Sequence, residues 1–125
     1  LNVCAHLILG LPGESRAHMI ESARIVSDLG VNGVKLHLLY VVKGTALADW
    51  HRKGLYHCLD QDVYADLVCD MLAHLRADIV IQRLTGDPHP NELVAPGWAL
   101  QKAQTIDLIR GRMQKQGIRQ GMCAV

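Results

Sequence analysis

Residues 3–14 read Val-Cys-Ala-His-Leu-Ile-Leu-Gly-Leu-Pro-Gly-Glu, an apolar run that leads into a turn rich in glycine and proline. Between residues 3 and 10 the one polar side chain is His6, and such a run predicts a strand buried on both faces, as in parallel sheets. Pro12 cannot donate to the ladder and ends the strand, and Ser15 is placed to cap a following helix. Loops at this end of a parallel strand bind ligands in α/β sheets and barrels, although Gly-Pro-Gly turns also simply connect strands to helices.

The alternation of strand and helix continues along the rest of the chain. The expected elements are a strand at 3–10, a helix at 15–29, a strand at 34–42, a short helix between Thr45 and Gly54, a helix that begins at Asp60, a strand at 78–84, a loop at 88–97 and a helix at 99–116. Parallel strands joined right-handedly by helices form a curved sheet with two open edges. The predicted fold class is therefore α/β, with three parallel βα units forming the rear part of a partial, TIM-like α/β barrel.

Residues 1–116 are predicted to form this part of the barrel, and residues 117–125 a frayed tail without periodicity. A closed α/β barrel typically takes about 200 or more residues, whereas the chain has 125. It begins with Leu1 rather than Met and enters an apolar strand within two residues. We therefore expect a piece of a longer protein, with the N-terminal half of the barrel absent.

The composition excludes few functions. Half of the residues are apolar, which indicates a globular chain, and the formal charge of +1 gives no electrostatic footprint for nucleic acid or an anionic membrane. No apolar run reaches the ~20 residues of a membrane helix, and no signal peptide is present, so we expect a reducing, cytoplasmic setting and no membrane. The four cysteines lie far apart and are expected to be buried or idle thiols rather than metal ligands; they are Cys4, Cys58, Cys69 and Cys123.

Polar side chains interrupt two of the predicted strands. Because side chains alternate along a strand, Lys35 and His37 share one side, and His6 shares a side with Cys4 and Ile8. If both strands line a barrel, these polar groups point inward and the aliphatic ones pack on the helices. A lysine is rarely buried without a partner or a task. The alternative is a hydrogen-bonded core histidine on each strand.

Two further groups of residues are candidates for binding. Lys43, Gly44 and Thr45 begin a long connection of the kind that often carries function, although a solvated connection is equally consistent. Arg83 ends the third predicted strand and could hold an anion or carboxylate through its planar guanidinium. A structural salt bridge is the alternative for Arg83.

Four ordered motifs resemble a known family. They are His6-Leu-Ile-Leu-Gly-Leu-Pro-Gly-Glu14, Gly33-Val-Lys-Leu-His-Leu-Leu-Tyr-Val-Val-Lys-Gly-Thr45, Arg83-Leu-Thr-Gly-Asp87 and Ala95-Pro-Gly-Trp98 with Lys102. In that order they resemble the carboxyl half of a bacterial radical SAM family akin to coproporphyrinogen dehydrogenase and the elongator-type tRNA-modifying enzymes. The resemblance implies a [4Fe-4S] cluster that cleaves S-adenosylmethionine and generates a 5′-deoxyadenosyl radical. The family's CxxxCxxC motif does not occur here, so the resemblance assigns no metal ligand and no catalytic residue to this chain.

The resemblance also implies binding residues. In the family a GxIxGxxE-like strand packs on adenine, and this sequence departs from it at His6 and places its acid one position late, at Glu14. The implied cofactor-binding residues are Ile8, Gly10, Leu11 and Pro12, with the backbone of Leu39, Tyr40 and Val41 at the adenine edge. The implied contacts to substrate, or to the carboxylate of S-adenosylmethionine, are Lys35, His37 and Arg83.

The predicted function is that of a fragment of a radical SAM enzyme, inactive alone. Its expected partners are the rest of its own barrel, an electron donor such as flavodoxin or ferredoxin, and an unknown substrate for which kinship suggests tRNA. Two alternatives stay open. One is a non-catalytic barrel piece or scaffold, and the other is a metal-dependent α/β-barrel lyase or hydrolase with His6 and His37 as ligands.

Overall fold

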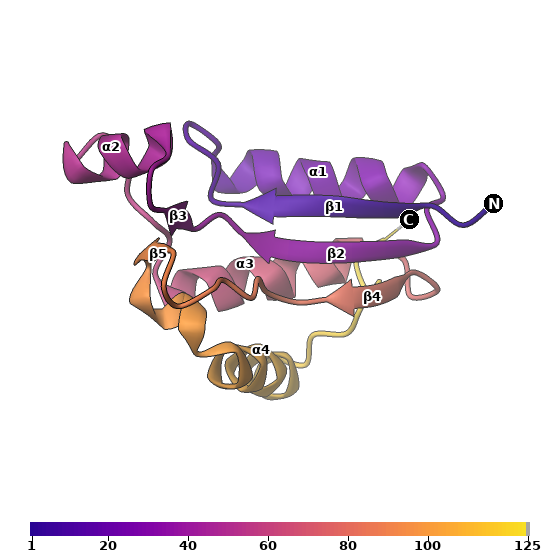
Figure 1. Cartoon of the computed structure of the whole chain (residues 1–125). Helices are drawn as coiled ribbons and strands as arrows, with labels where there is room; N and C mark the ends of the chain where they lie inside the picture. Colours follow the sequence, from indigo (N-terminus) through magenta and orange to yellow (C-terminus); the bar gives the residue numbers. More distant parts are fainter. Residues whose placement is uncertain (125) are drawn as a thin grey trace.

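The computed structural model describes residues 1–124 and shows strands alternating with helices along the chain (Figure 1). The elements are β1 (Cys4–Leu9), α1 (Arg16–Asp28), β2 (Gly33–Leu38), β3 (Val41–Val42), α2 (Ala46–Arg52), α3 (Gln61–His74), β4 (Val80–Arg83), β5 (Leu93–Ala95), the 3-10 helix η1 (Gly97–Leu100) and α4 (Lys102–Gln116). Within the described residues no helix is long and apolar enough to cross a membrane.

The central sheet has three parallel strands in the order β1-β2-β4, which confirms the predicted α/β class. In the register, His6 lies opposite Lys35, and a register shift after Val34 brings Arg83 opposite the other side of Lys35. Because β1 and β4 are the outer strands, both edges of this sheet are open within residues 1–124. A curved sheet with two open edges was the expected arrangement.

The hydrophobic core lies between this sheet and the helices α1, α3 and α4. On β2 the side chains of Val34, Leu36 and Leu38 are fully buried against the helices. Helix α3 supplies the apolar face that its periodicity predicted, and the buried members of that face are Tyr64, Leu67, Val68, Met71, Leu72 and Leu75. The alternate side chains of the strands point to the opposite face of the sheet.

The prediction that β1 is buried on both faces is wrong for the described chain. Cys4, His6 and Ile8 are exposed, while Ala5, Leu7 and Leu9 pack toward the helices. No element within residues 1–124 covers the face to which the exposed side chains point, so an apolar sequence is left with one open side.

The helix cap expected at Ser15 is confirmed, and most other helix ends also carry capping residues. Ser15 caps α1 by accepting a hydrogen bond from the His18 N–H, and Gly30 follows the helix at φ 75°. Thr45 caps α2 in the same way, and Gly117 ends α4 in the left-handed conformation. Asp60 occupies the N-cap of α3, but its side chain makes no capping hydrogen bond.

Two predictions about the connections were wrong. The strand expected at 34–42 breaks at Leu39 and Tyr40, and its last part, β3, pairs antiparallel with β5. The partner β5 lies inside the segment 88–97 that was expected to be a loop, because three residues are too few to show a strand period.

The tail was expected to fray, but residues 117–124 dock on the end of α3. The N–H groups of Gly121 and Cys123 donate to the carbonyls of Leu72 and Ala73, 3.0 and 2.8 Å away. The last carbonyls of a helix have no partner within the helix, so backbone N–H groups of the tail can donate hydrogen bonds to them. Residue 125 lies outside the described residues.

Candidate functional site

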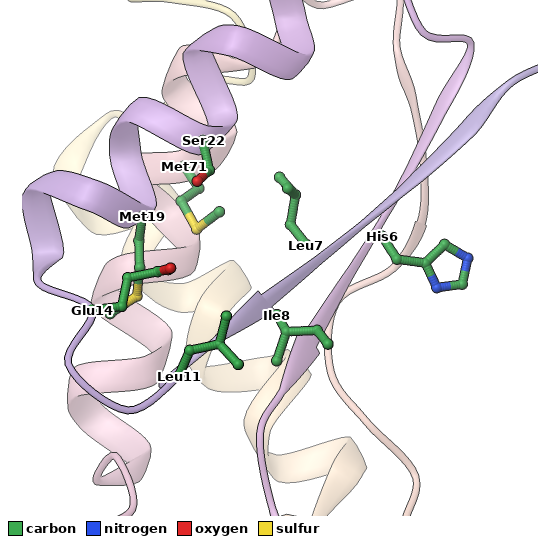
Figure 2. Close-up of a pocket in the computed structure, with 8 residues that line it drawn as sticks. All are labelled: His6, Leu7, Ile8, Leu11, Glu14, Met19, Ser22 and Met71. Atoms are coloured by element: carbon green, nitrogen blue, oxygen red, sulfur yellow. The ribbon is translucent and has the colours of Figure 1, made fainter.

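The face of the β1-β2-β4 sheet that turns away from the helices, called the inner face below, carries the predicted substrate contacts and Ile8. Figure 2 shows His6 pointing away from α1, whereas Leu7 points toward it. The side chains of the inner face are Cys4, His6, Ile8, Lys35, His37 and Gln82, and the irregularity in the β2-β4 register also brings the side chain of Arg83 to His37 on this face. The Cys4 thiol lies 3.6 Å from the side-chain oxygen of Gln82, which joins β1 to β4 across β2. The expectation that polar groups share one face and aliphatic groups pack on the helices is confirmed for β2, and on β1 with the exception of Ile8, which is exposed on the inner face.

The structure brings together the three predicted substrate contacts. An Nη of Arg83 donates to Nε2 of His37 over 3.4 Å, and Lys35 lies opposite Arg83 in the register. All three side chains are half-buried. Arg83 therefore lies against an imidazole and a lysine, and the ion pairs within residues 1–124 do not include it.

The charged groups that surround His37 are all basic. Burial lowers the pKa of His37, and the nearby positive charges of Arg83, His6 and Lys35 lower it further. His37 is therefore held neutral by its surroundings. A neutral imidazole that accepts a hydrogen bond from Arg83 at Nε2 carries its proton on Nδ1.

The metal-site alternative built on His6 and His37 finds no support in the geometry. The two rings are stacked, with centroids 6.3 Å apart and planes 7° from parallel. Lone pairs lie in the ring planes, so two stacked imidazoles do not direct them at one ion about 2 Å from each. Residues 1–124 contain no group of three His, Cys, Asp or Glu side chains that could hold a metal.

Gly10 is held in place by the fold itself. Its φ is +94°, and a Cβ there would lie 3.3 Å from the side chain of Leu59 and 3.4 Å from the hydroxyl of Tyr56. The Tyr56 hydroxyl donates to the Gly10 carbonyl over 2.6 Å, and burial raises the pKa of Tyr56 to about 12. Sequence reasoning missed Tyr56, because no local pattern links residues 46 positions apart.

Ile8 and Leu11 are exposed apolar side chains, 43% and 39% accessible, at the carboxyl end of β1. They border a cavity of about 200 Å³ that wraps the outer edge of β1 and reaches Glu14 and Met19 on the helix side (Figure 2). This volume is below the ~300 Å³ at which small-molecule sites begin. The cavity lies at the open edge of β1. The exposed apolar side chains of Ile8 and Leu11 beside it could pack against a flat ring.

The segment between β2 and β3 carries the other predicted cofactor contacts. The Leu39 N–H already donates to the Leu9 carbonyl over 2.9 Å, and Val41 is fully buried, so a ligand here would use other groups. The ring of Tyr40 lies against Gly86, where a Cβ would be 3.0 Å from the ring and 3.5 Å from Nδ1 of His37. Gly86 thus allows the loop after β4 to close on the site, a role hinted at by its place in the Arg83–Asp87 motif.

Lys43, Gly44 and Thr45 have structural roles in the described chain. The Lys43 N–H donates to the Glu92 carbonyl, and the Thr45 hydroxyl donates to the Val42 carbonyl and accepts from the Ala48 N–H. These contacts fix the start of α2 and the pairing of β3 with β5. A binding role for these residues stays a prediction.

The residues described do not fit a [4Fe-4S] cluster. Such clusters are held by several converging thiolates, whereas Cys69 is buried in α3, Cys4 lies on the inner face and Cys123 on the docked tail. The four thiols do not converge within residues 1–124. No step of a reaction can be derived through a cluster from this part of the protein.

A family model and two sequence relatives match most of this chain. The Radical_SAM C-terminal domain matches residues 31–115. The uncharacterized protein MJ0486 of Methanocaldococcus jannaschii is 43% identical over 122 residues, and YtqA of Bacillus subtilis is 38% identical over 121. Each of these matches covers 97% of this chain, and the chain spans 38% of the length of either relative.

The fold is also that of a solved structure. The archaeal Methanocaldococcus infernus Elp3 with an N-terminal deletion superposes with a TM-score of 0.77 and 20% identity, over 96% of this chain and 28% of that chain. At this identity the likeness shows the fold alone. The family match covers β2, β4 and the predicted substrate contacts, whereas Ile8, Gly10, Leu11 and Pro12 lie before it. Since the family match covers more than half of the chain, this chain belongs to the Radical_SAM C-terminal domain family.

Proposed function

We propose that this chain supplies part of the cofactor pocket and part of the substrate wall of a radical SAM enzyme. The observation that carries the proposal is that residues of one family motif set converge: Ile8 and Leu11 lie exposed at the carboxyl end of β1, next to the polar inner face. Ligands of α/β barrels bind at this end of the strands. S-adenosylmethionine, when bound, supplies the radical chemistry of such enzymes.

The chain's own residues would bind and orient. Ile8, Leu11 and Pro12 offer an apolar surface on which an adenine ring can pack, and the positive-φ turn at Gly10 joins Ile8 to Leu11 and Pro12. The segment Leu39–Val41 borders the same edge. Lys35, His37 and Arg83 then face the substrate. Other elements of the barrel would cover these side chains and exclude water from them.

The rest of the barrel is the expected partner of the two open sheet edges. Strands of the longer protein would pair with β1 and β4 and cover the inner face, which explains why an apolar strand such as β1 has an open side. The relatives, of which this chain spans 38%, are long enough to supply such strands. An electron donor such as flavodoxin or ferredoxin and a tRNA substrate are proposed on kinship alone.

The experiment is anaerobic reconstitution of the full-length gene product, followed by iron and sulfide analysis and an assay of 5′-deoxyadenosine formation with dithionite. We expect ~4 irons per protein and slow cleavage of S-adenosylmethionine. Protein that binds no iron and releases no 5′-deoxyadenosine would leave the fold without its chemistry and favour a scaffold. Gel-shift titration with total tRNA tests the substrate separately, and absence of binding removes tRNA.

A further inference from the structure

Four basic side chains meet on the inner face. His6, Lys35 and Arg83 lie in one row across β1, β2 and β4, and His37 lies one step closer to the carboxyl end. Adjacent strands are ~4.8 Å apart, so the row spans roughly 10 Å, the width of a small anion with its ligands. The hydrogen bond between Arg83 and His37 and the stacked His6 and His37 rings connect three of the groups, and the strand register places Lys35 between His6 and Arg83.

This row differs from the other cations that lack an ion pair in residues 1–124. Lys35 and Arg83 are half-buried, whereas the others are exposed to solvent: Lys43, Lys53, Arg110, Lys115 and Arg119. Exposed cations are solvated by water and screened by salt. A half-buried cation that faces two imidazoles and another cation needs a counter-charge.

We propose that Lys35, Arg83, His37 and His6 bind a phosphate or similar dianionic group of the substrate. Arg83 offers a planar fork for two oxygens, Lys35 a compact charge and the imidazoles further donors. The assignment rests on the proposed function for the claim that the inner face meets substrate. It goes beyond it by naming the chemical class that the substrate carries and by adding His6 to the site.

The same geometry predicts that His37 takes up a proton when the anion binds. The groups that face His37 are His6 on β1, Lys35 on β2, Arg83 on β4 and the ring of Tyr40 across Gly86. Burial first, and then the cations among these groups, hold the pKa of His37 below its usual range. A bound dianion offsets these positive charges and raises that pKa, so His37 takes up a proton more readily when the anion is bound.

The test is calorimetric titration of pyrophosphate into the full-length gene product near pH 7, which needs neither cluster nor reductant. We expect Lys35→Gln and Arg83→Gln each to weaken binding about tenfold or more, because each removes a charged hydrogen-bond donor. Lys115→Gln and Arg119→Gln, at exposed cations away from the sheet, are the matched controls and should bind within about twofold of the parent. Titrations in two buffers of different ionisation enthalpy should show that the parent takes up more protons than His37→Gln, because the protons exchanged by pyrophosphate itself are common to both proteins.

Three results would overturn the inference: no binding by the parent protein at millimolar pyrophosphate, equal binding by Lys35→Gln, or equal losses in the controls. Lys35→Met, which keeps the apolar stem, replaces Lys35→Gln if the latter melts early. Loss of affinity for S-adenosylmethionine instead of pyrophosphate would assign the row to the cofactor's carboxylate. Pyrophosphate binding without any cleavage of S-adenosylmethionine would refute the enzyme proposal and leave the anion site standing.

Discussion

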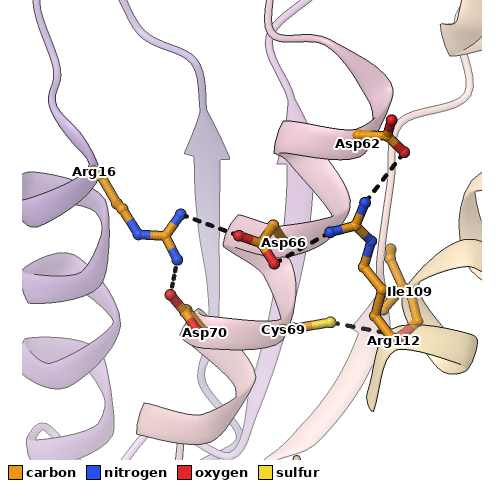
Figure 3. A network of polar contacts seen from close by, with 7 residues as sticks. All are labelled: Arg16, Asp62, Asp66, Cys69, Asp70, Ile109 and Arg112. Atoms are coloured by element: carbon orange, nitrogen blue, oxygen red, sulfur yellow. Dashed lines mark hydrogen bonds and ion pairs between the residues drawn. The ribbon is translucent and has the colours of Figure 1, made fainter. Parts of the chain in front are cut away.

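Charged side chains form ion pairs on the helix side of this protein, whereas on the inner face two cations have no carboxylate partner within residues 1–124. On the helix side, Asp66 of α3 lies between Arg16 of α1 and Arg112 of α4, and Asp70 and Asp62 complete the network (Figure 3). On the inner face, Lys35 and Arg83 are half-buried and meet no carboxylate within residues 1–124. Paired charges hold neighbouring helices in place, whereas unpaired charges are available to a ligand. The contrast separates residues that support helix packing from residues that we propose bind a ligand.

The largest expected effect compares neighbours on β2. Leu36 is fully buried, so Leu36→Ala should lower the free energy of unfolding by about 2–5 kcal/mol through lost burial and a cavity. Lys35→Ala on the opposite face should change it by less than ~0.5 kcal/mol while reducing turnover. Urea unfolding followed by circular dichroism, with 5′-deoxyadenosine assays, measures both. Equal destabilisation by the two substitutions would make Lys35 a core residue.

The next effect concerns Gly10, where the two regions meet. A side chain at φ +94° is strained and would press on Leu59 and Tyr56, so Gly10→Ala should cost about 1–3 kcal/mol of stability. Tyr56→Phe, which removes the hydrogen bond to the Gly10 carbonyl, should cost about 1 kcal/mol. Thermal melts compare the two variants. Gly10→Ala with an unchanged melting temperature but weaker S-adenosylmethionine binding would show that Gly10 is there for the ligand.

A smaller effect is expected from the charge network of the helices. Asp66→Asn removes the carboxylate shared by Arg16 and Arg112, and because these groups are partly exposed the loss should be about 0.5–1 kcal/mol and shrink at high salt. Arg83→Gln, which removes a cation without a carboxylate partner, should leave stability unchanged or slightly raised. Urea unfolding at low and high salt tests the pair. A larger loss in Arg83→Gln would place Arg83 among the structural charges.

The smallest effect is a pH dependence from His37. Its pKa is lower in the folded state than its ordinary 6.5, so the unfolded chain binds the proton more readily. The contribution to stability is therefore present above pH 6.5 and is lost as the pH falls below it. Melting temperatures of the parent and His37→Gln between pH 5 and 8 should diverge only at the acid end. Parallel curves would show that His37 is not crowded by cations in solution.

About half of the candidate site could be predicted from the sequence. Alternation along β1 and β2 correctly placed His6, Ile8, Lys35 and His37 on one face, because a strand's side chains alternate whatever surrounds it. The contact of Arg83 with His37, the support of Gly10 by Tyr56 and the closeness of Gly86 to Tyr40 could not be predicted. Each joins residues 46 positions apart that only the packed structure brings together.

The sequence by itself determined the order of strands and helices, the caps at Ser15 and Thr45 and the turns at Gly30 and Gly117, because these depend on backbone groups within a few residues. Only the tertiary structure decided the break after β2, the docking of residues 117–124 on α3 and the open side of β1. Those features depend on which distant groups satisfy a hydrogen bond or cover an apolar face, and no local pattern encodes that choice.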